Sequence, residues 1–214
     1  MPLPVRRDWI RTAAASLLIC GASGALVHAG SDGFRAFTTE QARRISIEQS
    51  PRALPLVSLE DQDGQPFTLS DYAGQSVAVN FIYTQCTSLC ALLSTGFQRV
   101  HNASGDGEKV RLLSISFDPR DTPDRLAEYA SHFAAHGANG AHGAGGRTWR
   151  FARVRDTTAI APLLRSFGIV VIADGKGDFK HNAAIHIVNA EGRLSRVLDA
   201  GAKPDEVVSA VVRR

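Results

Sequence analysis

Cysteine is scarce in this chain of 214 residues, which holds only three. Small disulfide-built domains use many more cysteines per residue, so that class is excluded. A strong excess of one charge is also missing, because 24 Lys and Arg stand against 21 Asp and Glu. No basic stripe with interleaved aromatic residues is present, so the sequence predicts no nucleic-acid partner. Hydrophobic residues make up 44% of the chain, enough for one ordinary domain and a leader segment.

The first part of the chain has the pattern of an export leader. Three arginines within residues 6–11 precede the segment 12–30, which contains no charged residue and is rich in Ala, Gly, Leu and Ser. A basic region followed by an apolar one is typical of a signal sequence, and the paired arginines also resemble a twin-arginine export signal. Ala29 offers a small residue for cleavage. Residues 1–30 are therefore predicted to be a cleaved export signal or an inner-membrane anchor, with the rest of the chain on the periplasmic face.

A folded domain is predicted over residues 52–214, after a polar segment, 31–51, that is expected to be a linker or a short helix outside the core. Within the domain, runs of β-forming residues alternate with apolar residues at helical spacing. The predicted strands span 54–59, 66–69, 77–83, 110–117, 149–154, 181–188 and 194–198. The predicted helices span 89–100, 123–136, 157–167 and 204–214.

This order of elements predicts an α/β fold. Strands that alternate with helices favour a mostly parallel sheet covered on both faces, to which terminal hairpins add antiparallel strands. The most economical architecture is a thioredoxin-like three-layer fold with an N-terminal β-hairpin over 54–69. The segment 149–167 adds an inserted β-α unit. Residues 137–146, rich in Gly, Ala and His, are expected to form a surface insertion.

Cys86 and Cys90 lie where the predicted strand 77–83 passes into the predicted helix 89–100. Four positions apart on a helix, their Cβ atoms would be about 5 to 6 Å apart, whereas a relaxed disulfide needs about 3.5 to 4.5 Å. A metal ion can bridge the wider gap. The helix N-terminus favours thiolates, and thiolates select soft ions such as Cu(I) or Zn(II). Two buried structural cysteines are the alternative; Cys20, inside the leader, is given no role.

His181 is the candidate third ligand. It opens the predicted strand 181–188, which a thioredoxin fold would place near the cysteine-bearing helix, although a surface histidine is the alternative. His186 differs from His181 by an odd number of positions, so a regular strand would turn it to the other face, where it is expected to be structural. Asp118 ends the strand 110–117 on the same rim as the cysteines. It is predicted either to orient a ligand or receive a proton, or to open an ordinary Asp-Pro turn.

Other histidines give weaker signals. His132 and His136 have the i, i+4 spacing of a helical metal pair but no acidic residue between them. They are therefore expected to lie on a solvated helix flank. His142, within 137–146, is expected to be exposed.

Three ordered motifs together resemble the Sco/SenC family of thioredoxin-like copper proteins, over residues 55–212. The motifs are VNFIYT at 79–84 leading into CTSLC at 86–90, SISFDP at 114–119 followed by Asp121-Thr122, and His181 just ahead of 185–192. The resemblance implies a metallochaperone that binds a copper ion through Cys86, Cys90 and His181. It implies delivery of copper, or reduction of the receiving thiols, during assembly of the copper centre of a haem-copper oxidase. The implied partner is the membrane-bound oxidase copper subunit or another periplasmic copper or thiol protein.

The sequence departs from the family pattern at three positions. Proline usually follows each cysteine in the family, but here those places hold Thr87 and Ala91, and Lys180 stands where an acidic residue commonly precedes the histidine. None of these changes removes a ligand, but a positive neighbour disfavours bound Cu(I). The alternative function is a copper-independent thiol-disulfide oxidoreductase that cycles Cys86 and Cys90. A peroxiredoxin is disfavoured, because no proline lies shortly before Cys86.

Overall fold

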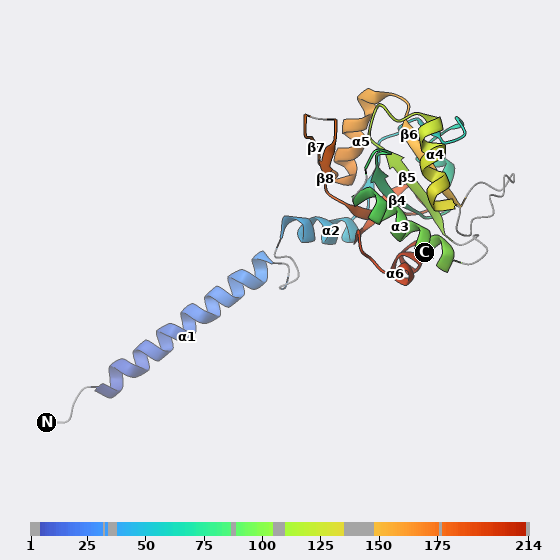
Figure 1. The fold of residues 1–214 in the computed structure, drawn as a ribbon. Helices are drawn as coiled ribbons and strands as arrows, with labels where there is room; N and C mark the ends of the chain where they lie inside the picture. Colours follow the sequence, from blue (N-terminus) through green and yellow to red (C-terminus); the bar gives the residue numbers. More distant parts are fainter. Residues whose placement is uncertain are drawn as a thin grey trace. The chain divides into compact units, whose positions relative to one another are not determined.

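The computed structural model describes residues 5–31, 33, 38–86, 89–104, 110–134, 148–175 and 177–212 (Figure 1). The chain divides into two compact units, Met1–Gln49 and Ser50–Arg214. The predicted insertion 137–146, with His136 and His142, lies outside the described residues.

The first unit contains the helices α1 (Val5–Gly30) and α2 (Thr39–Gln49). Within α1, the segment Trp9–Gly30 is long and apolar enough to cross a membrane, with 22 residues and a mean hydropathy of 1.6. α2 lies in the segment expected to be a linker or a short helix. Glu40 stabilises its first turn by pairing with Arg43 at 2.7 Å and with Arg44 at 3.0 Å, the neighbours that helical spacing provides.

The second unit is built on an eight-stranded sheet in its described part, with the order β1-β10-β9-β4-β5-β6-β2-β3. The strands are β1 (Arg52–Ala53), β2 (Leu59–Asp61), β3 (Pro66–Phe67), β4 (Val77–Ile82), β5 (Arg111–Ser116), β6 (Trp149–Val154), β9 (Ala184–Val188) and β10 (Arg193–Asp199). β4, β5 and β6 are parallel, and the other neighbours pair antiparallel. The sheet is therefore mixed, parallel at its centre but not mostly parallel as predicted.

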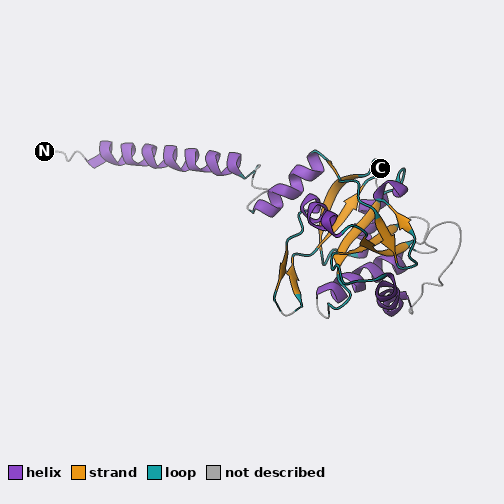
Figure 2. Cartoon of the chain, turned by 90° about the horizontal axis from the view of Figure 1, so that it is seen from above, coloured by secondary structure: helices purple, strands orange, loops and turns teal. Residues whose placement is uncertain are grey.

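Helices cover both faces of this sheet (Figure 2). One face packs against α3 (Leu89–Ala103) and α6 (Pro204–Val212), in a core that includes Ala78, Phe97 and Val207. α4 (Pro123–Ala134) lies on the same face, where Tyr129 contacts Phe151. The other face receives α5 (Ile160–Phe167), which follows the short 3-10 helix η2 (Thr157–Ala159). The three layers are those of the predicted architecture.

Several predicted local structures are present. The hairpin β2–β3 turns at Gly64, whose φ of 74° suits a residue without a side chain. Its first strand begins at Leu59 rather than at residue 54. α5 ends at Gly168 in the left-handed conformation, with φ 72°, as its position after Phe167 predicts.

The predicted strand 181–188 is wrong as a single element. His181 ends β8 (Phe179–His181), which pairs with β7 (Val171–Ala173) in a separate two-stranded sheet, and β9 begins only at Ala184. Figure 2 shows this hairpin lying apart from the main sheet. The alternation argument that related His181 to His186 therefore does not apply, although His186 itself lies on the α5 side of the sheet.

Candidate functional site

Cys86 follows the central strand β4, all six residues of which are buried. A turn after the strand brings the Cys86 N–H to 3.2 Å from the Tyr83 carbonyl, and the side chain is 7% exposed. α3 begins three residues later, so Cys90 lies in its first turn. The side chain of Cys90 lies outside the described part of the structure. The strand-to-helix junction predicted for the two cysteines is present.

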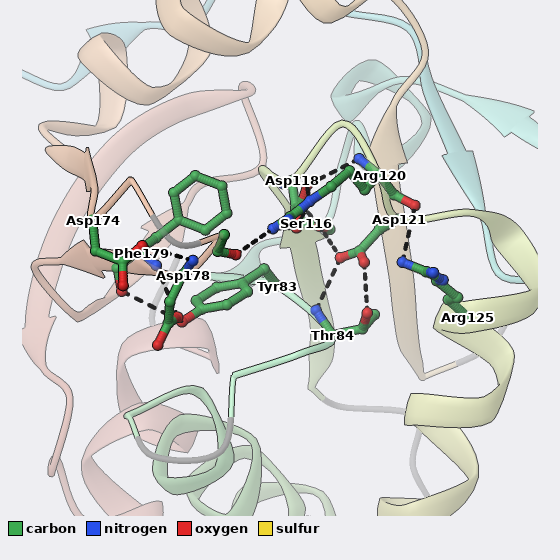
Figure 3. Close-up of polar contacts among 11 residues, drawn as sticks. Tyr83, Thr84, Ser116, Asp118, Arg120, Asp121, Arg125, Asp174, Asp178 and Phe179 are labelled. Atoms are coloured by element: carbon green, nitrogen blue, oxygen red, sulfur yellow. Dashed lines mark hydrogen bonds and ion pairs between the residues drawn. The ribbon is translucent and has the colours of Figure 1, made fainter.

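A buried carboxylate holds the segment that leads to Cys86. Asp121, 1% exposed, accepts hydrogen bonds from the Thr84 N–H at 2.9 Å and from the Thr84 hydroxyl at 2.5 Å. The Ser116 hydroxyl donates to the same carboxylate at 2.5 Å. Figure 3 shows Asp121 between the ends of β4 and β5. Hydrogen bonds to a charged acceptor are stronger than neutral ones, so Asp121 joins the two strand ends firmly.

Tyr83 lies beside both Cys86 and the hairpin that carries His181. Its hydroxyl donates to the Asp178 carboxylate and lies 3.3 Å from the Phe179 carbonyl. Burial raises the pKa of Tyr83, and its hydrogen bonds with Asp178 and Cys86 raise it further. The bond from Tyr83 also lowers the pKa of Asp178. Tyr83 is therefore a protonated donor at neutral pH and Asp178 an ionised acceptor.

His181 packs against aromatic rings on the rim of the sheet. Its ring centroid lies 5.0 Å from that of Phe117 and 6.2 Å from that of Tyr83. Its Nδ1 is 2.9 Å from the carbonyl oxygen of Asn182. A carbonyl only accepts, so Nδ1 carries the proton, and in the neutral ring Nε2 carries the lone pair. Histidine ligands are commonly held this way, with one ring nitrogen bound to a carbonyl and the other presented to a metal.

Asp118 contacts Arg120, a residue to which the sequence analysis gave no role. The Asp118 side chain is 1% exposed and accepts from Arg120 Nη2 at 2.7 Å. Arg120 Nε and its backbone N–H donate to the same carboxylate, each at 2.9 Å. The predicted turn is present, since the Asp121 N–H donates to the Asp118 carbonyl at 3.1 Å. The Asp118 carboxylate also forms an ion pair with Arg120.

The structure also describes three other residues that the sequence analysis considered. His186 is fully buried and packs edge-on against Phe81 and Phe167, at 5.9 and 5.2 Å between ring centroids, which agrees with its predicted structural role. His132 is exposed on α4, and Cys20 is exposed on α1. Among the side chains that the structure describes, no three of His, Cys, Asp and Glu form a group able to hold a metal. The Cys90 side chain is not among those described, so this finding does not test the predicted ligands Cys86, Cys90 and His181.

The site residues that the sequence analysis missed are Tyr83, Arg120, Asp121 and Asp178. Three of them stand within or beside the motifs that carried the family resemblance. No local pattern in the sequence predicts their contacts, because Tyr83 and its partner Asp178 are 95 residues apart in the chain. Asp121 and its partner Thr84 are 37 residues apart.

The SCO1/SenC family model matches residues 53–214. A relative from Stutzerimonas stutzeri, named "Putative copper-binding protein", is 30% identical over 129 residues, which are 59% of this chain and 62% of the relative. The matched part therefore spans less than two thirds of that curated relative.

Sco proteins are among the solved structures with the same fold. ScoI from Bradyrhizobium japonicum, solved with copper bound, is 25% identical, with a TM-score of 0.59 over 74% of this chain and 97% of its own. A SCO1/SenC family lipoprotein from Bacillus anthracis str. Ames is 17% identical, with a TM-score of 0.65 over 76% of this chain and 94% of its own. These likenesses confirm the predicted thioredoxin-like fold.

Proposed function

The chain belongs to the SCO1/SenC family, and from that premise we propose that it is a metallochaperone that binds one copper ion through Cys86, Cys90 and His181. The family is the one that the three sequence motifs predicted. The observation that supports the copper proposal is the setting of His181, whose Nδ1 lies 2.9 Å from the Asn182 carbonyl oxygen, so that a neutral ring would ligate copper through Nε2.

The chemistry of the donor set supports a soft ion. Two thiolates and one imidazole suit Cu(I), which prefers sulfur and nitrogen ligands to oxygen. Cys86 is buried at the end of β4, and its neighbour Tyr83 also contacts the His181 ring. These two donors therefore adjoin a common side chain. The relatives point the same way, since ScoI from Bradyrhizobium japonicum was solved with copper bound.

As cargo, the copper would pass to the copper subunit of a membrane-bound haem-copper oxidase during its assembly, or the cysteine pair would reduce the receiving thiols. We place this activity on the periplasmic face, after export directed by residues 1–30. α1 supports that location, because Trp9–Gly30 is able to span a membrane. The alternative function is a copper-independent thiol-disulfide oxidoreductase that uses the same two cysteines. The experiment must distinguish it from the metallochaperone.

Anaerobic titration of the full chain with Cu(I), in detergent and with a competing chelator, tests the copper proposal. We expect one Cu(I) per chain, and a dissociation constant about 10-fold or more higher in H181A, because second-shell changes alone cost that much. H132A, at an exposed histidine of α4, is the matched control and should bind as the wild type does. Equally weak binding by wild type and H181A, together with disulfide reductase activity that survives H181A, would instead establish the oxidoreductase.

A further inference from the structure

The hairpin β7–β8 that carries His181 has no ladder to the eight-stranded sheet in the described structure. At its base, the Asn182 side chain accepts from the Val170 N–H at 2.7 Å and donates to the Gly168 carbonyl at 3.0 Å. A two-stranded hairpin is marginally stable alone. The position of β8 over the cysteine-bearing rim therefore depends on side chains that reach it from other elements.

Arg120 reaches the hairpin from the carboxyl end of β5 (Figure 3). Its Nη2 lies 2.7 Å from the Asp118 carboxylate and 2.7 Å from the Gly177 carbonyl, and donates to both. The guanidinium carbon also lies 5.4 Å from the centre of the Phe179 ring, within the range of a cation-π contact. One side chain thus joins the buried Asp118 to two residues of the hairpin.

Gly177 is fitted to this contact. Its φ is 98°, and a Cβ built there would lie 3.2 Å from Arg120 Nη1. Gly175, in the same hairpin, also has a positive φ, 75°, but has no atom within 4 Å of a built Cβ. The lack of a side chain at Gly177 therefore permits the close approach of Arg120, beyond what the backbone conformation alone requires.

The contact is transmitted to His181 along β8. Phe179 lies two residues before His181 and packs edge-on against Tyr83 at 5.2 Å and Phe117 at 5.5 Å. His181 packs against the same two rings. A movement of Phe179 away from the rim would therefore carry the imidazole with it.

We infer that Arg120 is a positioning residue: it acts as a latch, meaning that its contacts hold β8 against the end of β5 and so keep the His181 ring beside Tyr83. Its consequence for copper rests on the proposed function: without the latch, the copper site keeps its two cysteines and loses the fixed imidazole.

Hydrogen exchange and X-ray absorption on the full chain test this role. In R120Q we expect the amides of β8 to exchange about 10-fold faster, since a hydrogen bond to a charged group contributes that much to local closure. The Cu(I)-loaded R120Q should keep its sulfur scatterers and lose the nitrogen. In R120K the exchange rate of β8 should lie between those of the wild type and R120Q, because a lysine ammonium keeps the positive charge but lacks the planar, forked guanidinium of arginine. R165Q, at an exposed arginine of α5, should match the wild type.

Wild-type exchange of β8 in a folded R120Q would overturn the latch. If the wild type binds no copper, the proposed function fails, whereas the exchange rates still decide the role of Arg120. R120Q alone leaves the buried Asp118 carboxylate without its arginine, which by itself could unfold the protein. The double variant D118N/R120Q removes that charge, so it separates the loss of the contact with the hairpin from a general loss of folding. This double variant should fold and still show fast exchange in β8.

A glycine pair provides the second test. G177A should speed exchange in β8 and displace the copper-bound nitrogen more than G175A does, because only Gly177 has Arg120 within 4 Å of a built Cβ. Both changes place alanine at a positive φ, so backbone strain contributes in both variants. Equal effects of the two substitutions would contradict a contact between Arg120 and Gly177 that positions the hairpin.

Discussion

At the scale of single residues, Asp121 links the carboxyl ends of the central strands β4 and β5. It is buried, and it accepts hydrogen bonds from Ser116 and from Thr84, which lies 37 residues earlier. Thr84 stands two residues before Cys86. A carboxylate that satisfies several buried donors is difficult to replace, because its removal leaves each donor without an acceptor.

We therefore expect D121A to lower the free energy of unfolding by about 3 kcal/mol, as the loss of hydrogen bonds to a buried charge predicts. D121N should lose less, since the amide oxygen still accepts. Urea unfolding measures both. E128A, at an exposed position of α4, is the control and should stay within about 0.5 kcal/mol of the wild type. Equal stability of D121A and E128A would mean that Asp121 does not hold this rim.

At the scale of elements, the sequence predicts best where burial leaves a local pattern. β4 is buried along its whole length, so it appears as a run that is apolar except at Asn80, and α5 ends at the glycine that follows its last apolar residue. The buried strand and the helical spacing of apolar residues after it predict that the two cysteines lie at a strand-to-helix junction.

The β7–β8 hairpin was missed because its causes are not local. Its strands have three residues each, too few to show an alternation, and its glycines resemble those of a loop. It is held by Arg120 and Tyr83, which are 57 and 95 residues from their partners in the chain. The same long-range contacts explain why the roles of Tyr83 and Arg120 were not predicted, although both stand in or beside recognised motifs.

Asn182 explains why the predicted strand 181–188 is broken, and it can be tested. Its side chain takes the place of a strand partner for Val170 and Gly168. In N182A we expect the Val170 amide to exchange about 5-fold faster, which corresponds to about 1 kcal/mol for an exposed hydrogen bond. N189A removes a similar turn contact, with the Arg193 N–H at 2.9 Å, and should leave Val170 unchanged. Slow exchange of Val170 in N182A would show that other contacts close the hairpin base.

At the scale of the whole molecule, the chain divides into two compact units of different composition. The family match begins at residue 53, within the unit Ser50–Arg214 that contains the sheet and the candidate ligands. The unit Met1–Gln49 contains α1, whose large apolar side chains are exposed, among them Leu17, Leu18 and Leu26. A helix of this length and composition is able to cross a membrane, and a signal sequence has the same features.

Export is therefore the prediction that belongs to the whole molecule. We expect the domain to be released by osmotic shock if the leader is cleaved, or to be digested by protease in intact spheroplasts if α1 remains as an anchor. The mass of the mature chain distinguishes these two outcomes. A variant without residues 1–30 should stay in the cytoplasm, protected until the cells are lysed. If the Arg6-Arg7 pair directs a twin-arginine route, replacing both with lysine should also retain the chain. A full-length chain that stays protected inside intact spheroplasts would contradict export and, with it, delivery of copper on the periplasmic face.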